Sequence, residues 1–234
     1  MVQLLYVMFQ SVSVSLKIFF LTIVFSVPLA LPIAFGRMSK RKVVRGIINF
    51  YLLIMRGTPL ILQLIFIYFA PKYLLQFLLN SFSASIQSET FWYIVRALLS
   101  YNRFTAVIIA FSLNYAAYFA EIYRGGIESI PKGQYEAAKV LGFTEAQTFG
   151  KIIVPQVIKR ILPATGNEII TLVKDTALAQ TIGVAELFHA AQNASAREFS
   201  TTPIFIAGVF YLIMNWIVTL IFAYTEKKLS YYRS

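Results

Sequence analysis

The sequence predicts an all-α polytopic membrane protein that forms a single domain over residues 1–234. Hydrophobic residues make up 58% of the chain, and aromatic residues make up 16%. Charged residues make up only 13%, about half of the roughly 25% that is usual in soluble domains. The mean hydropathy is +0.69, and long apolar stretches alternate with shorter polar ones, as expected when several helices cross a bilayer.

The net charge of +11 has two possible explanations, nucleic-acid binding or the collection of Lys and Arg in cytoplasmic loops. We favour the second explanation, because it also fits the apolar composition. The chain contains no cysteine, which excludes disulfides and thiol chemistry.

The N-terminal region predicts a surface helix followed by the first span. Residues 1–15 are apolar with interspersed serines, which favours an interfacial helix, and residues 18–36 are long enough to cross the membrane. A signal peptide is the alternative, but the run is too long and no small-residue cleavage site follows it. The next basic cluster should be cytoplasmic, which places the N-terminus outside: Arg37, Lys40, Arg41, Lys42 and Arg45.

The second span is predicted at residues 47–69, with Arg56-Gly57-Thr58-Pro59 near its middle. Proline at this depth removes a helical hydrogen bond, and arginine is costly in hydrocarbon. Residues 70–102 should lie outside, with helices on the outer interface at 72–82 and 91–99.

The third, fourth and fifth spans are predicted at residues 104–123, 161–188 and 203–224, with a short external loop at 190–202. The fourth segment is too polar to face lipid, so it should face protein or a water-filled cavity. The alternative is that it does not cross the membrane. With five spans, 14 of the 21 Lys and Arg residues lie inside, whereas dropping the fourth would put the basic C-terminus outside. The polar residues of the fourth segment are Glu168, Thr171, Lys174, Asp175, Thr176 and Gln180.

The polar loop before the fourth span predicts two short helices joined by a tight turn. Pro131 suits the first turn of a helix, and Gly142 suits the left-handed position after its end. Thr144 with Gln147 fits a capping box that opens a second helix, which should end before Pro155. The alternative is a surface helix–turn–helix with no binding partner. If the turn instead receives another protein's backbone, small residues should lie on its outer side: Ala137, Ala138 and Gly142.

Glu136-Ala137-Ala138, followed by Gly142, Ile152 and Pro155, resembles the EAA loop of permease subunits of ATP-binding cassette (ABC) importers. The similarity runs from about Ser11 to the C-terminus, and the other motifs resemble the branch that transports polar amino acids. These motifs are Arg56-Gly57-Thr58-Pro59, Arg124-Gly125-Gly126-Ile127, Gln156, Leu162-Pro163-Ala164, Gly166-Asn167-Glu168 and Lys174-Asp175-Thr176.

The resemblance implies a five-helix type I ABC importer permease fold in a bacterial inner membrane, with a cytoplasmic coupling loop at about residues 125–160. It implies a second permease subunit, identical or paralogous, two ATPase subunits that bind ATP and Mg²⁺, and an external substrate-binding protein. Closure of the ATPases would move the coupling loops and rock the permease between inward and outward access. The residues expected to contact the ATPase are Tyr135, Glu136, Ala137, Ala138, Leu141 and Gly142.

The sequence contains no G-x-x-x-x-G-K-[ST] phosphate loop, and its single histidine, His189, excludes an H-E-x-x-H zinc site. We therefore expect a transport subunit rather than an enzyme, with no cofactor, metal or nucleic acid bound by this chain.

Polar residues near mid-membrane form the candidate substrate pathway, because intramembrane ionisable groups and broken helices are typical of transporter sites. A polar amino acid is the expected substrate, with Arg, Lys or His slightly favoured over Gln or Glu. The competing functions are a stand-alone secondary transporter or channel, and a membrane assembly protein. The predicted pathway residues are Arg56, Gly57, Thr58, Asn114, Tyr118, Glu121, Lys174, Asp175 and Thr176.

The alternative for the charged residues is that they pair only to fix packing, for example Arg56 with Asp175 or Lys174 with Glu168. Glu121 lies nearer the cytoplasmic end and equally suits an inner-gate ion pair, with either of two cations: Arg124 or Lys132.

Overall fold

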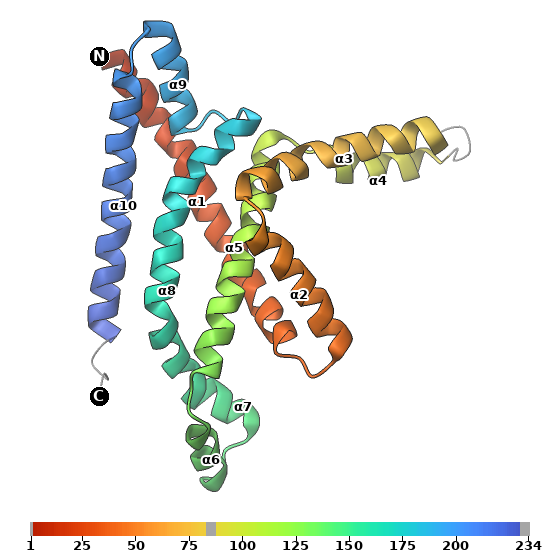
Figure 1. Cartoon of the computed structure of the whole chain (residues 1–234), viewed down its shortest axis with the longest axis vertical. Coiled ribbons are helices and arrows are strands. Elements are labelled where there is room, and N and C mark those ends of the chain that lie inside the picture. Colours follow the sequence, from red (N-terminus) through yellow and green to blue (C-terminus); the bar gives the residue numbers. More distant parts are fainter. Residues whose placement is uncertain (1, 83–87, 230–234) are drawn as a thin grey trace.

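The structure, a computed structural model, describes residues 2–82 and 88–229, and every regular element within these ranges is a helix. Four long helices pack along one another and set the long direction of the molecule (Figure 1). The central helix, α5 (Arg103–Glu128), contributes the large buried side chains Phe111, Tyr115 and Phe119 to the core. The all-α class is therefore confirmed. The four helices are α1 (Val2–Arg37), α5 (Arg103–Glu128), α8 (Val154–Asp175) and α10 (Thr202–Leu229).

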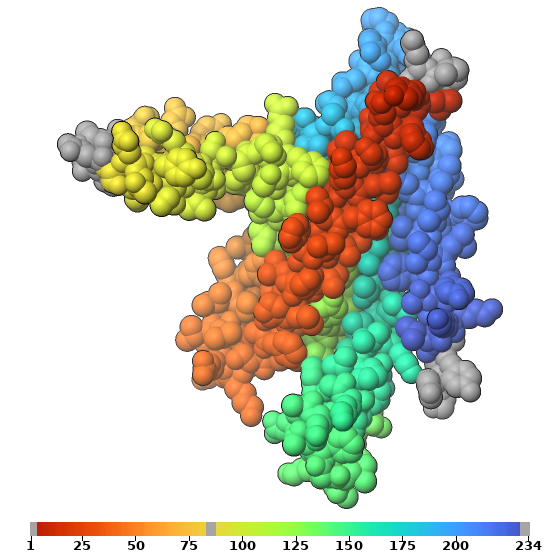
Figure 2. Space-filling model, turned by 180° about the vertical axis from the view of Figure 1, so that it is seen from behind, coloured from red at the N-terminus to blue at the C-terminus, as the bar shows by residue number. Residues whose placement is uncertain are grey.

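Helix α1 is one continuous helix, so the predicted boundary between a surface helix and the first span does not exist. Ser15 is buried and no residue near it interrupts the hydrogen-bond ladder. At about 1.5 Å per residue its 36 residues span about 54 Å, more than the roughly 30 Å hydrocarbon core. The helix lies obliquely across the molecule (Figure 2), which is how a long apolar helix fits a thinner bilayer.

The predicted second span is two helices, α2 (Lys42–Gly57) and α3 (Leu60–Phe82). The expected interruption is confirmed, since Thr58 is extended at φ −122° and ψ 149° and Pro59 opens the next segment. A single span over 47–69 is wrong, because α3 leaves the bundle sideways (Figure 1).

Helix α3 continues through Pro71 without a break, so the predicted separate helix at 72–82 is its second half. Helix α4 (Glu89–Leu99) begins at a Ser88 cap and runs back beside α3, and together they form an arm that projects from the bundle (Figure 1). By length and composition α1, α3, α5 and α10 can cross a membrane, but α3 lies across the direction of the other three. The polar α8 runs with them instead.

The predicted fourth span is too long, because α8 ends at Asp175 and gives way to a tight 3₁₀ helix, η2 (Thr176–Ile182). Gly183 then adopts φ +76°, a left-handed conformation that reverses the chain. Most of the predicted loop at 190–202 is helix α9 (Leu187–Glu198). Its first turn is capped by the buried Glu186 carboxylate, which accepts hydrogen bonds from the N–H groups of Phe188 and His189, both at 2.7 Å.

The two ends of the bundle differ in charge. The basic turn between α1 and α2, the loop between α5 and α8 and the end of α10 all lie at one end (Figure 1). Helix α9 and the start of α1 lie at the opposite end.

Candidate functional site

Glu121 is the centre of an ionic cluster that joins three helices. Its carboxylate lies 3.4 Å from Arg37 at the end of α1, 3.5 Å from Arg56 at the end of α2 and 2.9 Å from Arg124 in its own helix. Arg124 also pairs with Glu128 one turn later. The expected pairing of Glu121 with Arg124 is therefore present, and within the described part of the chain the alternative pairing with Lys132 is not.

Arg56 does not pair with Asp175, nor Lys174 with Glu168, among the residues that the structure describes. The Arg56 guanidinium instead lies over the Tyr118 ring, 5.5 Å from its centroid. The Arg56 side chain keeps 44% of its surface exposed, compared with 16% for Glu121. The Arg56 side chain therefore contacts both Glu121 and Tyr118 and remains partly exposed.

Asp175 closes α8 and accepts a hydrogen bond of 2.7 Å from the hydroxyl of Tyr115 in α5. Tyr115 is almost fully buried, whereas Asp175 is half-buried and Lys174 beside it is exposed. Sequence reasoning placed Tyr115 in the third span but not in the pathway, because a tyrosine in an apolar helix gives no separate signal of its partner.

Asn114 is only 4% exposed, and its side chain forms hydrogen bonds at the break between α2 and α3. Its amide donates to the carbonyl of Met55 at 2.8 Å and to the side-chain oxygen of Gln63 at 2.9 Å. Gln63 in turn donates to Met55 and to both oxygens of Thr58 at 2.8 to 3.0 Å. These amides satisfy carbonyls that α2 leaves free where it ends. Asn114 is therefore enclosed by protein, contrary to its expected place as an open ligand of the substrate.

Thr176 also differs from its expected position. It is 1% exposed, and its hydroxyl donates to the carbonyl of Val173 at 2.8 Å. It is the first residue of η2 and lines an apolar groove between α1 and α10, which Lys174 does not line. The remaining predicted pathway residues lie on α2, α5 and α8, except Thr58, which follows the end of α2. We group the charged and aromatic ones with Glu168, which was expected in the fourth segment but not in the pathway, and leave out Gly57 and Thr58. We call this group the polar face: Arg56, Tyr118, Glu121, Glu168, Lys174 and Asp175.

Glycines leave free space beside the polar face near Glu121. A Cβ atom built at Gly57 or Gly125 would meet nothing within 4 Å. A cavity of about 420 Å³ lies between α5 and α8 beside Glu121, and its lining includes Gly125, Ser129 and Arg160. The space beside the ionic cluster is therefore accessible.

The loop between α5 and α8 follows the predicted pattern at its turn. Helix α6 (Lys132–Val140) is followed by Leu141 and then by Gly142, whose φ of +79° is the expected left-handed one. The Thr144–Gln147 capping box is present and opens the short α7 (Glu145–Gln147).

The second helix of the loop does not end before Pro155. A π-helix, η1 (Thr148–Ile153), follows α7 and passes directly into α8, with Pro155 in the first turn of α8. Proline needs no N–H partner there, and a π turn is wider than an α turn, so the chain stays helical.

Some residues of α6 and the turn that follows it are exposed to solvent, whereas Ala138 is buried. Val140 and Leu141 are 88% and 74% exposed at the tip of the loop, which extends beyond the bundle (Figure 1). Ala138 is only 1% exposed, so its expected place on the outer side is wrong. Its carbonyl accepts a hydrogen bond of 3.0 Å from the N–H of Phe143, within the turn. The exposed residues of the predicted coupling set are Tyr135, Glu136, Ala137, Leu141 and Gly142.

No group of three or more His, Asp or Glu side chains suited to a metal ion occurs in the described ranges.

Comparisons with known proteins agree with these features. Residues 26–231 match the family described as binding-protein-dependent transport system inner membrane component. The chain is 34% identical to the arginine transport system permease protein ArtQ of Bacillus subtilis over 222 residues, which cover 94% of this chain and 91% of ArtQ. It is 36% identical to the octopine transport system permease protein OccM of Rhizobium radiobacter over 208 residues, covering 87% and 79% of the two chains.

Solved structures show the same arrangement. A chain from a crystal structure of an amino acid ABC transporter with histidines superposes with a TM-score of 0.79 at 32% identity, covering 97% of this chain and 96% of that one. A chain of the MetNI methionine ABC transporter in an inward-facing conformation has a TM-score of 0.72 at 17% identity, which shows a shared fold, and covers 96% of each chain. This chain therefore belongs to the family of binding-protein-dependent transport system inner membrane components, the permease subunits of ABC importers.

Proposed function

We propose that this permease subunit imports a polar amino acid, that it pairs with a second permease, identical or paralogous, and that two cytoplasmic ATPases and an external binding protein complete the transporter. The ATPases would bind ATP and Mg²⁺, and this chain would bind neither. The proposal is supported by the family match and by relatives named as arginine and octopine permeases. The basic end of the bundle would face the cytoplasm, with the N-terminus outside.

The polar face is the proposed substrate pathway, and the position of Arg56 carries this proposal. Arg56 is a partly exposed cation at the break between α2 and α3, oriented by Tyr118 and Glu121. A guanidinium so placed suits the α-carboxylate of an amino acid. Glu168 and Asp175, both half-buried on α8, offer acceptors for an ammonium group. Asn114 and Thr176 act behind the face, as supports of its backbone.

The test of the pathway is Arg56→Gln in the assembled transporter, with Arg45→Gln as a control on the same helix. Thermal unfolding is measured without ligand and with saturating Arg, Lys, His, Gln or Glu. We expect the amino acid that stabilises the native transporter to lose most of its stabilising effect in Arg56→Gln and to keep it in Arg45→Gln. If Arg56→Gln retains the full ligand-induced shift, the carboxylate site lies elsewhere.

The exposed tip of α6 is the proposed contact with the ATPase. Val140 and Leu141 present apolar surface to solvent at the end of a loop that is packed underneath by Ile130, Ile153 and Val157. Apolar side chains this exposed on a rigid support are typical of an interface with another protein. The loop would transmit ATP-driven closure to α5 and α8, because it joins both helices directly.

A further inference from the structure

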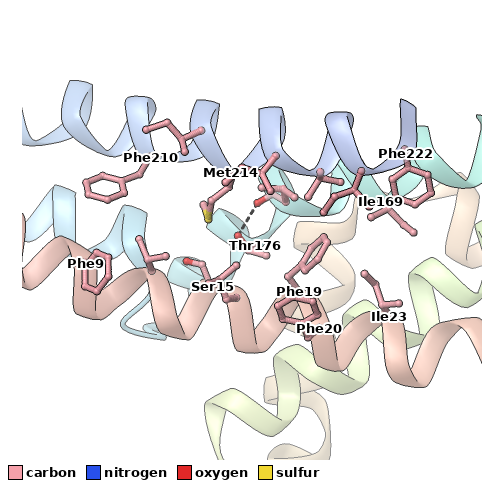
Figure 3. A pocket seen from close by; sticks show the side chains of 17 residues that line it. Phe9, Ser15, Phe19, Phe20, Ile23, Ile169, Thr176, Phe210, Met214 and Phe222 are labelled. Atoms are coloured by element: carbon pink, nitrogen blue, oxygen red, sulfur yellow. Dashed lines mark hydrogen bonds between the residues drawn. The ribbon is translucent and has the colours of Figure 1, made fainter. Parts of the chain in front are cut away.

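An apolar groove of about 680 Å³ runs between α1 and α10, on the opposite side of the molecule from the view in Figure 1. Helix α8 forms its floor, and Figure 3 shows side chains of α1 and α10 directed into it. Among its lining residues, all within the described part of the chain, none is charged. Its large side chains are Phe9, Phe19, Phe20, Phe210, Met214 and Phe222.

The two polar residues of the lining already have partners within the protein. Thr176 donates to the carbonyl of Val173 at 2.8 Å, the contact dashed in Figure 3. The Ser15 hydroxyl accepts from the N–H of Leu187 at 3.2 Å and lies 3.5 Å from the Glu186 carboxylate. The groove therefore offers almost no unsatisfied polar group to water or to a polar ligand, and hydrocarbon is the occupant that its chemistry favours.

The dimensions of the groove fit a single hydrocarbon chain. From Phe9 to Ile23 the α1 wall extends about 21 Å at about 1.5 Å per residue. One leaflet of a bilayer contributes about 15 Å of hydrocarbon, half of the roughly 30 Å core. One acyl chain could therefore lie along the groove within its own leaflet.

The position of the groove on α8 argues for lipid rather than for a second permease. Ile169, Val173 and Thr176 line it, whereas Asn167 and Lys174 point the other way, since successive helical residues turn by about 100°. If two permeases enclose the polar face, as the proposed function requires, the groove between α1 and α10 is left toward the bilayer. This step rests on the proposed function.

We propose that this groove is a binding site for one acyl chain of a membrane phospholipid. The chain fills the gap between α1 and α10 and contacts the α8 floor, so it packs against three helices rather than against one. Contact with several helices distinguishes it from ordinary boundary lipid, because the number of atom contacts sets the strength of packing in a membrane. Occupancy would link α10 to α1 through the lipid.

The experiment uses the assembled transporter in nanodiscs that contain a phospholipid with a photoactivatable diazirine in the middle of one acyl chain. Cross-linked residues and the number of labels per permease are read by mass spectrometry. The variant is Ile213→Trp, in the groove wall, and the control is Leu212→Trp, the adjacent residue, which does not line the groove. Both native residues are exposed, at 46% for Ile213 and 69% for Leu212.

We expect groove labelling to saturate at one lipid per permease, to fall about fivefold in Ile213→Trp and to remain unchanged in Leu212→Trp. Labelling that rises linearly with the probe and is equal in both variants would show ordinary boundary lipid and overturn the proposal. Competition by free fatty acid but not by unlabelled phospholipid would also overturn it.

A second permease in the groove is tested separately. The chain has no cysteine, so Ile213→Cys provides a unique thiol. Cross-linking from Cys at 213 to another permease in the assembled transporter would contradict the lipid site, whereas its absence together with saturable lipid labelling supports it. Failure of the amino-acid assay with Arg56→Gln would leave the labelling result unaffected, so the two proposals are distinguishable.

Discussion

Single residues on α5 hold the ends of neighbouring helices in place. Glu121 binds arginines from α1, α2 and α5, and Asn114 binds the end of α2 and the start of α3. The sequence marks both as polar residues in an apolar helix, which is a correct signal of importance. It does not show whether such a residue meets substrate or protein, because that depends on side chains more than fifty positions away.

We predict that Glu121→Gln lowers the thermal stability of the permease more than Glu128→Gln. Glu121 is the shared partner of three arginines, whereas Glu128 is 53% exposed and pairs with Arg124 alone. The expected difference is about 1–3 kcal/mol, the usual effect of leaving a partly buried charged group without its partner. Thermal unfolding at low and high salt measures it, and the gap should narrow in high salt. Equal melting temperatures for the two variants would refute the claim that Glu121 stabilises the permease by pairing with three arginines.

Asn114→Ala should reduce stability without removing ligand binding. The substitution leaves the Gln63 side-chain oxygen without its amide donor and removes one of the two amide donors to the Met55 carbonyl. Leaving a buried acceptor unsatisfied typically costs about 1–3 kcal/mol. The amino acid that stabilises the native transporter should stabilise this variant by a similar increment, in contrast to Arg56→Gln. If the variant loses the ligand-induced stabilisation while its stability without ligand is unchanged, Asn114 belongs to the substrate site.

Local patterns at the scale of single elements were predictable where neighbouring residues decide the outcome. Pro59 interrupts the second span, Gly142 takes the left-handed position and Thr144 caps with Gln147, as the sequence indicates. Two errors involve a wide helical turn and a buried cap, which the sequence pattern did not indicate. Helix α8 carries Pro155 in its first turn because a π-helix leads directly into it, and α9 forms where a loop was expected because the buried Glu186 caps it.

At the α6 turn we predict that Leu141→Asp uncouples ATP hydrolysis from transport. A carboxylate would place a charge in an apolar contact, while the permease itself should insert and fold normally because the native side chain is already exposed. Co-purification of the ATPase and substrate-stimulated ATP hydrolysis should both fall severalfold or more. Val43→Asp, at a residue 75% exposed on α2, is the matched control and should retain both. Normal stimulation in Leu141→Asp would exclude the tip of α6 as the contact.

At the scale of the whole molecule, charge and apolar composition predicted the class correctly, but not the path of every helix. The direction of the α3–α4 arm is one such error, since α3 is apolar enough to cross a membrane and lies across the bundle instead. Composition does not encode this angle. The placement of the groove and of the polar face on different sides of α8 also appears only once the helices are packed.

The topology predicts which residues a membrane-impermeant thiol reagent reaches in intact cells. A cysteine at Ser39, between α1 and α2, should react only after permeabilisation, and one at the exposed Thr201, between α9 and α10, should react in intact cells. No native cysteine contributes background. Labelling of Ser39→Cys from outside would reverse the proposed orientation.

Reconstituted transport tests the central claim most directly, that this chain converts ATP hydrolysis by partner subunits into import of a polar amino acid. The measurement is uptake of radiolabelled Arg, Lys, His, Gln or Glu into proteoliposomes with the ATPase and the binding protein, with and without ATP. We predict accumulation of at least one of them that requires ATP and the ATPase, and that Leu141→Asp abolishes. Equal uptake without the ATPase subunits would contradict the account and indicate a stand-alone transporter or channel.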